Sequence, residues 1–387
     1  MSEVTVRKTY KFKLKPTPEQ ERQFDTIVWR CRTVYNTALE QRKTIYVQRG
    51  ISVTYYQQKA ELPGIKEAMP EFSEVHSQVL QDVVLRVDRA FQAFFRRVKA
   101  GETPGHPRFH GRDRFNSFTY PQYDNGACLD NGFLVLSKIG RVAVRWSRPL
   151  AGTPKTVTIS READGWYVSI SCADVPVEPL PLTGQETGID LGLALFVTLA
   201  DGTMIHNPRC YREAERRLKT AQRTVARRKK GSKRRRKAVK LLAKAHQKVR
   251  RQRQDFQHKA ALHLVREYDT IYHEELQVAN MVKNHSLAKS IADAGWSGFL
   301  SILNHKAACA GRSVVAVNPA YTSQTCSGCG VIVKKGLSVR WHSCPECGTS
   351  LHRDHNAALN ILRRGQEQST DGQSVQALTW ASRPSVA

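Results

Sequence analysis

Acidic residues are scarce in this sequence. Its 387 residues include 34 aspartates and glutamates against 61 lysines and arginines, which gives a formal net charge of +27 at pH 7. A chain with so much unbalanced positive charge repels itself unless a polyanion surrounds it. The composition therefore favours nucleic acid as the partner.

Long apolar runs are also missing. No apolar stretch approaches the roughly 18 residues that a membrane-spanning helix requires, and no signal peptide opens the chain. We therefore expect no membrane partner. A hydrophobic content of 40% still supports a buried core. The length suggests two or three domains, at the usual size of about 100 to 200 residues each.

The cysteine count is odd, with nine in all. Four cysteines form two Cys-x-x-C pairs on either side of residues 330–343, namely Cys326, Cys329, Cys344 and Cys347. This spacing predicts one zinc ion in a tetrahedral four-thiolate ribbon, with His342 as the one substitute ligand. A redox pair is the alternative, but it needs only one Cys-x-x-C. We expect the other five to be small buried residues in a reducing cytosol: Cys31, Cys128, Cys172, Cys210 and Cys309.

A single carboxylate lies inside an apolar, β-prone run. Asp190 is flanked by Ile189 and Leu191, and the run continues to the turn dipeptide Asp201-Gly202. An ionised aspartate in such surroundings is costly to bury unless something pairs with it. Mg²⁺ is a natural partner, because it binds carboxylates together with phosphate oxygens. The alternative is a strand-end aspartate satisfied by backbone amides.

Two later segments add acids in similar settings. Residues 269–276 predict a strand that ends in Glu274 and Glu275, and residues 351–362 predict a loop entering a helix near Asp354. A solvated strand end and a helix N-cap are the alternatives for these acids. Together, however, three carboxylates of this kind are what a two-metal nuclease needs, because two ions about 3.5–4 Å apart clamp the phosphodiester.

The first hundred residues predict one strand followed by helices. The expected ranges are 4–14 for the strand and 18–50, 54–61 and 73–99 for the helices. Thr17 and Gln20 form a capping box at the start of the first helix. Arginines on these helices favour contact with a nucleic-acid backbone, although a solvated helix face is the alternative.

The next segment predicts a small β-barrel. Residues 127–175 show short alternating strands separated by turns, and the N-terminal strand is expected to complete the barrel around the inserted helices. Aromatic residues between 109 and 123 alternate with arginines, so they either stack on bases or form the barrel core. Residues 176–185 predict a linker.

A very basic helical segment is expected over residues 209–262. Its densest part runs from Arg227 to Lys237, and so many like charges in a row need counter-charge. RNA or heteroduplex phosphate is the expected source. The candidate contacts in this segment are Arg227, Arg228, Arg234, Arg235 and Arg236.

Four motifs in order resemble the TnpB (OrfB) family of bacterial insertion sequences. They are Gly188–Gly192, then His273–Leu276 with Asn280-Met281, then the double Cys-x-x-C, then Arg353–Ala358. The resemblance implies an α/β multidomain fold: an RNase H-like (RuvC) nuclease with an inserted zinc ribbon, and a small WED-like β-barrel with an inserted helical recognition lobe. It also selects Glu274 over Glu275, because the family's acid stands two residues before a leucine.

The implied domains are ordered along the chain. They are the first barrel strand (1–16), the helical lobe (17–107), the remaining barrel and linker (108–185), the nuclease (186–325), the zinc ribbon (326–350), the last nuclease helix (351–365) and a disordered tail (366–387).

The resemblance implies a Mg²⁺-dependent, RNA-guided DNA endonuclease encoded by a transposon. Asp190, Glu274 and Asp354 would hold two Mg²⁺ ions, and one chain would bind one structured guide RNA from the transposon end. The target would be double-stranded DNA beside a short motif, and the location the bacterial cytoplasm, at the nucleoid when on DNA. The residues where the family reads its motif are Tyr56, Ser77, Gln78, Gln81 and Asn116.

Two other functions stay open at this point. A guide-directed DNA-binding protein without cleavage would retain the same RNA and DNA contacts, but the presence of all three acids argues against it. A RuvC-like transposase or resolvase would need no RNA. The basic segment and the barrel with its helices favour RNA binding over that alternative.

Overall fold

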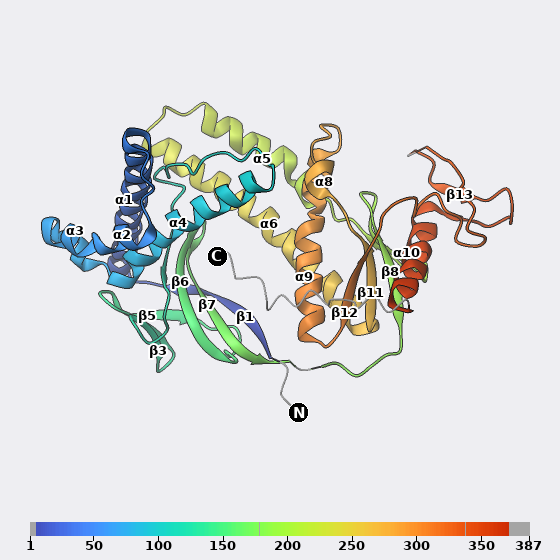
Figure 1. Ribbon diagram of the computed structural model, residues 1–387, viewed down its shortest axis with the longest axis horizontal. Coiled ribbons are helices and arrows are strands. Elements are labelled where there is room, and N and C mark those ends of the chain that lie inside the picture. The colour runs from blue at the N-terminus through green and yellow to red at the C-terminus, as the bar shows by residue number, and fades with distance from the viewer. Residues whose placement is uncertain (1–4, 178, 337, 371–387) are drawn as a thin grey trace. The chain divides into compact units, whose positions relative to one another are not determined.

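The computed structural model describes residues 5–177, 179–336 and 338–370 (Figure 1). These residues form two compact units, the first ending at Pro176 and the second beginning at Val177. Each unit contains its own β-sheet and its own hydrophobic core. No helix in the described ranges is long and apolar enough to cross a membrane.

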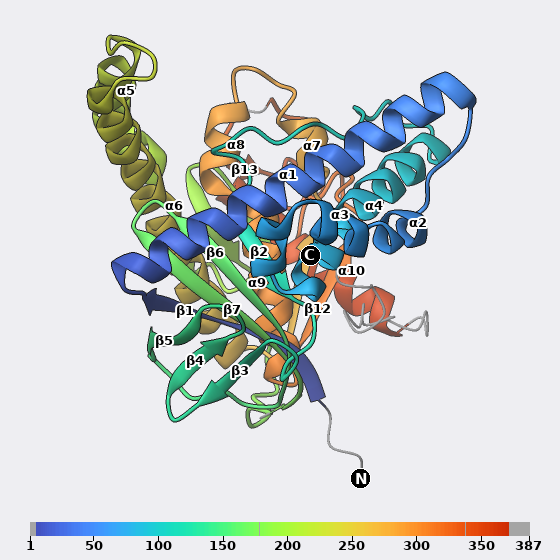
Figure 2. The same cartoon turned by 90° about the vertical axis from the view of Figure 1, so that its left-hand side faces the viewer.

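The helices of the first unit follow a single strand. Their bounds are α1 Pro18–Arg49, α2 Tyr55–Ala60, α3 Leu62–Ala68, the 3-10 helix η1 Pro70–Glu74 and α4 Ser77–Lys99. The predicted capping box is confirmed: the Thr17 hydroxyl accepts from the Gln20 backbone N–H at 3.2 Å, and the Gln20 side chain accepts from the Thr17 N–H at 3.1 Å. Because η1 is a separate turn, the helix predicted from 73 begins at Ser77. α1 packs along α4 (Figure 2).

The first unit also contains a seven-stranded antiparallel sheet. Its strands are β1 Thr5–Lys15, β2 Ser117–Tyr120, β3 Ala127–Asp130, β4 Phe133–Leu136, β5 Gly140–Arg145, β6 Thr153–Glu162 and β7 Gly165–Pro176. They lie in the order β2-β6-β7-β1-β5-β4-β3. β1 pairs with both β5 and β7, so the first strand joins those that follow the helices. The end strands β2 and β3 form no ladder with each other within the described residues.

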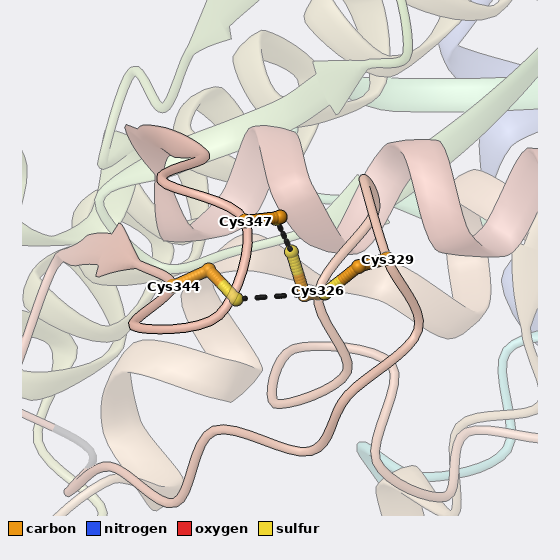
Figure 3. A group of neighbouring side chains, drawn as sticks. All are labelled: Cys326, Cys329, Cys344 and Cys347. Atoms are coloured by element: carbon orange, nitrogen blue, oxygen red, sulfur yellow. Dashed lines mark hydrogen bonds between the residues drawn. The ribbon is translucent and has the colours of Figure 1, made fainter.

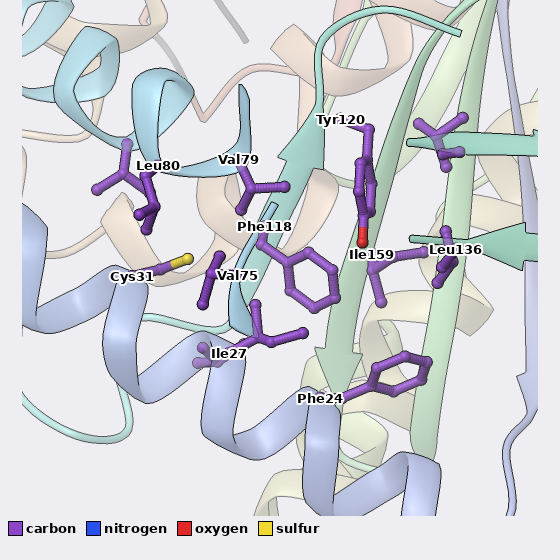
Figure 4. Close-up of a cluster of buried hydrophobic side chains, with 14 of the residues drawn as sticks. Phe24, Ile27, Cys31, Val75, Val79, Leu80, Phe118, Tyr120, Leu136 and Ile159 are labelled. Carbon is purple, nitrogen blue, oxygen red and sulfur yellow. The ribbon is translucent and has the colours of Figure 1, made fainter. Parts of the chain in front are cut away.

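Most of the aromatic residues that follow α4 belong to the core of this unit. Figure 4 shows Phe24 of α1 beside Phe118 and Tyr120 of β2, all of them buried. The ring centroids of Phe24 and Phe118 are 6.0 Å apart. Phe109 differs, because its side chain is 51% exposed and the Lys43 ammonium lies 4.9 Å from its ring centroid. Core packing therefore explains Phe118 and Tyr120, whereas the exposed Phe109 ring lies outside the core, against Lys43.

The second unit is built on a mixed five-stranded sheet in the order β10-β9-β8-β11-β12. The strands are β8 Glu186–Leu191, β9 Leu195–Leu199, β10 Met204–His206, β11 Thr270–Glu274 and β12 Ser313–Val317. β8 is antiparallel to β9 and parallel to β11, which is parallel to β12. The apolar run that was expected to continue to Asp201-Gly202 forms two strands, because the chain turns between Gly192 and Ala194.

Helices cover both faces of this sheet (Figure 1). The helices of the second unit are α5 Cys210–Ala226, α6 Lys233–Glu267, α7 Val278–Met281, α8 Ala288–Ala294, α9 Trp296–Cys309 and α10 Arg353–Thr370. α6 and α9 pack against the face that presents Ile189 and Ile271. α10 covers the opposite face, where Ile361 contacts Tyr272 and Val317. A hairpin of β13 Trp341–Ser343 and β14 Ser350–His352 precedes α10.

The basic helical segment expected over 209–262 consists of two helices, α5 and α6. α5 and α6 pack along each other and are joined by a turn at 227–232. The Ser232 hydroxyl caps α6 by accepting from the backbone N–H of Arg235 at 3.1 Å. The Arg235 guanidinium donates to the Val225 carbonyl at 2.6 Å, so this arginine closes the turn.

The cysteines and the C-terminal segment differ from expectation. Cys31 and Cys172 are buried, but the other three isolated cysteines are only partly buried, namely Cys128, Cys210 and Cys309. The tail was expected to begin at residue 366, yet α10 continues through Gly365 to Thr370. Residues 371–387 lie outside the described residues.

Candidate active site and metal centre

Two parallel strands bring the first two candidate acids to the same sheet edge. His273 of β11 pairs with Ile189 of β8, so the next residues along the two strands are Glu274 and Asp190. Both acids therefore lie at the carboxyl ends of adjacent parallel strands, where ligand sites of open α/β sheets are found. Asp190 and Glu274 are partly buried, whereas Glu275 is exposed.

Close packing of α10 on β8 brings in the third acid. A Cβ atom on Gly188 would lie 2.2 Å from the Ala358 carbonyl oxygen, so the helix backbone rests directly on the strand. Asp354 lies one helical turn before Ala358, and a Cβ on Gly192 would lie 3.9 Å from its Oδ2 atom. Because side chains alternate along a strand, Asp190 faces the same side as the two glycines and faces the start of α10.

The three carboxylates repel one another. Burial, followed by the charges of Glu274 and Asp354, raises the pKa of Asp190 well above its usual value, and Arg353 and Arg340 oppose this only in part. No hydrogen bond from the described residues reaches the Asp190 carboxylate, so backbone amides do not satisfy it. Burial also raises the pKa of Glu274, against a hydrogen bond from Thr322 and the nearby Arg364.

One arginine and two histidines lie near the third acid. An Arg340 guanidinium nitrogen lies 4.0 Å from Asp354 Oδ1, and His352 Nδ1 lies 3.9 Å from Oδ2. His355 Nε2 lies 3.0 Å from the Ala200 carbonyl, which ties the first turn of α10 to the end of β9. Sequence reasoning did not assign a role to these neighbours; Arg340 is 14 residues from Asp354, and only the fold brings it close.

The donor set fits a hard divalent cation. Its ligands are carboxylate oxygens, as Mg²⁺ prefers, and the uncompensated charge at Asp190 calls for positive charge. The three acids are more widely spaced than the cysteines: among the described residues, only the cysteine group brings its ligand atoms all within 4.8 Å of one another. Two ions about 3.5–4 Å apart need ligands spread around both.

The four cysteine sulfurs converge on one point (Figure 3). The sulfur atoms of Cys326 and Cys347 are 3.6 Å apart, as are those of Cys329 and Cys344. A tetrahedron with Zn–S bonds of about 2.3 Å has sulfur–sulfur edges of about 3.8 Å. Thr349 lies 3.0 Å from the Cys347 sulfur, and its hydrogen bonds lower the pKa of that thiol. The site therefore fits a zinc ion bound by thiolates.

Comparison with known proteins finds relatives that match this chain over nearly all of its length and of theirs. The family model described as "Probable transposase" (OrfB_IS605) matches residues 169–285. A protein of Streptomyces pristinaespiralis named "Putative RNA-guided DNA endonuclease" is 37% identical, over 98% of this chain and 94% of its own length. The Escherichia coli K12 protein "Putative RNA-guided DNA endonuclease InsQ" is 30% identical, over 95% and 94%. The chain belongs to the TnpB (OrfB) family.

Two further family models match this TnpB chain. The model described as "Helix-turn-helix domain" matches residues 1–50, whose described part is the strand β1 followed by the single helix α1. The model described as "Cas12f1-like, TNB domain" matches residues 296–361, which include all four cysteines and Asp354. Among solved structures, the mini-RNA-guided endonuclease CRISPR-Cas_phi3 is similar, with a TM-score of 0.49, 11% identity and coverage of 93% of this chain and 92% of that chain.

Three of the five candidate motif-contacting residues of the TnpB chain line one pocket. It has a volume of about 420 Å³ between α2, α3 and α4, and Tyr56, Ser77 and Gln81 border it. Lys59 and Lys66 border it too, and sequence reasoning missed both. The Lys66 ammonium donates to the Ser77 hydroxyl at 2.9 Å.

The other two candidates lie elsewhere in the same unit. The Gln78 amide donates to the Gln122 side chain at 2.6 Å. Asn116 is exposed. Its backbone carbonyl accepts a hydrogen bond from the Arg161 backbone N–H at 2.8 Å, which fixes the residue at the edge where β2 pairs with β6. Neither residue borders the pocket.

Four of the five candidate arginines of the basic segment are exposed. They are Arg227, Arg228, Arg234 and Arg236, at the turn between α5 and α6 and at the start of α6. Arg235 is half-buried, and its guanidinium donates to the Val225 carbonyl at 2.6 Å; the exposed Arg236 makes a longer contact, to the Gly231 carbonyl at 3.3 Å. The exposed arginines are available to phosphate groups, whereas Arg235 has a structural part in the turn.

Proposed function

We propose that this chain is a transposon-encoded, RNA-guided DNA endonuclease in which Asp190, Glu274 and Asp354 bind Mg²⁺. The observation that carries the proposal is that these three carboxylates lie within electrostatic reach of one another on one face of a mixed sheet, with no hydrogen bond from the described residues to the Asp190 carboxylate. Two relatives, each matched over 94% of its own length, are named "Putative RNA-guided DNA endonuclease" and "Putative RNA-guided DNA endonuclease InsQ", which supports both the RNA guide and the DNA substrate.

The fold proposed for the second unit is RNase H-like (RuvC), with the zinc ribbon inserted before α10. Its support is the mixed sheet with helices on both faces and the acids at the carboxyl ends of β8 and β11. For the first unit we propose a WED-like barrel with the helices as a recognition lobe. β1 lies between β5 and β7, which supports the insertion of the helices after the first strand.

The mechanism assigns a separate part to each side chain. Mg²⁺ held by Asp190, Glu274 and Asp354 would act as a Lewis acid, which would activate water and stabilise the departing 3′ oxygen. Asp190 lies within the fields of both other acids, so it is the acid that most requires the cation. Thr322 holds Glu274 by a hydrogen bond, and the first turn of α10 presents Asp354. Arg340, 4.0 Å from Asp354 and exposed, is available to a phosphate oxygen.

The proposed partners are one structured guide RNA from the transposon end and a double-stranded target DNA. The exposed basic turn between α5 and α6 supplies phosphate contacts for the RNA. The pocket lined by Tyr56, Ser77 and Gln81 is the proposed reader of the target-adjacent motif, with Lys59 and Lys66 as additional donors. A zinc ion held by the four cysteines completes the cofactors.

Cleavage assays with matched glutamate variants test the active site. In Mg²⁺, Asp190→Ala and Glu274→Gln should abolish DNA cutting, whereas Glu275→Gln should retain it, because Glu275 is exposed and lies outside the cluster. All three variants should bind RNA like the parent protein. Equal cutting by Glu274→Gln and the parent, or loss of cutting in Glu275→Gln alone, would contradict the assignment.

The RNA carried by protein purified from cells tests the guide. Bound RNA raises absorbance at 260 nm, and sequencing should recover one transposon-end transcript. Protein that cuts DNA after complete RNA digestion would instead be an RNA-independent transposase or resolvase. Protein that carries the RNA and binds matching DNA without cutting it in Mg²⁺ would be a guide-directed binder.

A further inference from the structure

Thr322 makes a hydrogen bond to one of the three acids from a distant part of the chain. Its side chain is 3% exposed, and its hydroxyl donates to the Oε1 atom of Glu274. Thr322 belongs to the loop between β12 and Cys326, 48 residues after Glu274. Within the described residues no other hydrogen-bond donor reaches this carboxylate. The direction in which Glu274 points therefore depends on the position of this loop.

Two buried asparagines of α10 hold the loop in place. The Asn360 amide, 1% exposed, donates to the carbonyls of Thr322 at 2.8 Å and Thr325 at 2.7 Å. One turn earlier, the fully buried Asn356 donates to the Thr325 carbonyl at 2.7 Å. Its Oδ1 atom accepts from the backbone N–H of Ser327 at 2.9 Å.

These contacts connect the zinc-binding knuckle to the acids. Ser327 follows Cys326 within the first Cys-x-x-C pair, so the hydrogen bond to Asn356 attaches that knuckle to α10. The same helix carries Asp354 in its first turn. One helix therefore fixes three things at once: the knuckle, the loop of Thr322 and the third acid.

We propose that Thr322 is a positioning residue for Glu274, and that Asn356 and Asn360 make its placement depend on the zinc-binding knuckle at Cys326. This inference rests on the proposed nuclease function. The threonine holds one carboxylate oxygen, so that the other stays directed toward the Mg²⁺ site. Outer contacts of this kind orient metal ligands, and their loss costs about 10- to 100-fold in metal affinity.

Thr322→Val tests the first part, because valine keeps the shape and removes the hydroxyl. The Mg²⁺ concentration at half-maximal cleavage should rise about 10-fold or more, while the rate at saturating Mg²⁺ stays near the parent's. Thr322→Ser should restore the parent midpoint, since serine keeps the hydroxyl. If Thr322 had only a structural role, Thr322→Val would lower the cleavage rate at all Mg²⁺ concentrations, and Thr322→Ser would not restore the parent midpoint.

A binding measurement without DNA gives a readout that is independent of activity. Mg²⁺ alone is titrated into the RNA-bound protein while the unfolding temperature is recorded. The midpoint of the Mg²⁺-dependent rise should shift upward in Thr322→Val and return in Thr322→Ser. Equal midpoints in parent and Thr322→Val would overturn the inference and leave the nuclease proposal standing. A parent protein with neither Mg²⁺ stabilisation nor cleavage would overturn both.

Zinc removal tests the second part. Stripping zinc with a chelator should raise the Mg²⁺ midpoint of the parent protein, but should add little in Thr322→Val, because both changes release the same carboxylate. Asn356→Ala should raise the midpoint with its zinc content unchanged, which separates the connection from any loss of fold caused by chelation. Two results would overturn the proposed dependence on the knuckle. The first is that zinc removal raises the Mg²⁺ midpoint of Thr322→Val by the same factor as that of the parent. The second is that Asn356→Ala has the same Mg²⁺ midpoint as the parent.

Discussion

At the residue scale, Asp190 occupies a position that is unfavourable for an ionised carboxylate. Burial and the charges of Glu274 and Asp354 raise its pKa, and no hydrogen bond from the described residues offsets them. This arrangement favours cation binding, because the carboxylates that repel one another all attract a cation placed between them. The metal-free protein, however, is destabilised by it.

We therefore predict that Asp190→Asn raises the unfolding temperature of the metal-free protein while it abolishes cutting. The sign follows from the raised pKa: the folded protein holds this proton more tightly than the unfolded chain, so the destabilisation develops as pH rises above the usual aspartate value. The gain should be larger at pH 8 than at pH 5. Thermal unfolding in a chelator at both pH values checks it.

Mg²⁺ provides the control for this prediction. The ion should raise the unfolding temperature of the parent protein and have little effect on Asp190→Asn, because ligand binding stabilises only the form that binds. A metal-free Asp190→Asn protein that unfolds below the parent at pH 8 would contradict the electrostatic account.

At the element scale, the helical hairpin of α5 and α6 separates two kinds of basic residue. Arg235 donates to the Val225 carbonyl and closes the turn, whereas its neighbours Arg234 and Lys237 are exposed. A change that removes all charges in the cluster would therefore mix loss of RNA contacts with loss of the turn. Sparing Arg235 removes charge without removing that hydrogen bond.

Neutralising Arg234, Arg236 and Lys237 to glutamine should weaken RNA binding and flatten its salt dependence. Each lost phosphate contact lowers the slope of log K against log salt by about 0.7 on a single strand or about 0.9 on a duplex, so three contacts predict a decrease of about 2 to 3. Affinities at several salt concentrations give the slope.

Three exposed basic residues at the end of α4 form the comparison variant, since the change removes the same charge from a helix whose arginines are the other candidates for nucleic-acid contact. They are Arg96, Arg97 and Lys99. A slope that falls only in this α4 variant would show that the RNA lies on the first unit instead of on the hairpin.

The four-cysteine element, for which we propose a zinc ion, has a direct test. Parent protein should contain one zinc per chain, and Cys344→Ser should lose it, because a structural site needs all four ligands. Cys309→Ser, which changes a cysteine outside the cluster, should keep one zinc. Elemental analysis of freshly purified protein decides; equal zinc in Cys344→Ser and the parent would exclude the four-cysteine site.

At the scale of the whole molecule, the large positive net charge affects the stability of the folded chain. The formal charge of +27 is spread over two units that each have their own hydrophobic core. Self-repulsion of this kind destabilises a compact chain in the absence of counter-charge. RNA supplies that counter-charge, and dissolved salt supplies part of it by screening.

Salt should therefore act in opposite directions on the two forms of the protein. The RNA-free form should unfold at a higher temperature as NaCl is raised, because screening reduces repulsion. The RNA-bound form should unfold at a lower temperature, because salt weakens phosphate contacts. Thermal unfolding before and after RNase treatment compares them. A decrease in both forms would mean that attractive ion pairs, not repulsion, dominate the free protein.

Short-range patterns in the sequence by themselves determined several features. The capping box of Thr17 and Gln20 joins residues three apart, whose geometry the helix backbone sets. Similarly, two Cys-x-x-C pairs carry their own knuckle spacing, and the four sulfurs do converge. The zinc ion itself stays a prediction, as do the metal-binding parts of Asp190, Glu274 and Asp354, although the structure brings these acids within electrostatic reach of one another.

Only the tertiary structure decided the contacts between distant segments. Sequence spacing could not show that α10 rests on Gly188, that Thr322 holds Glu274, or that Arg235 closes a turn. Each of these contacts depends on how helices and strands pack, and packing is set by the combined shape of many side chains rather than by a local period. An exposed arginine and a structural one look alike in a basic run, because their difference lies in which carbonyl or phosphate the fold places beside them.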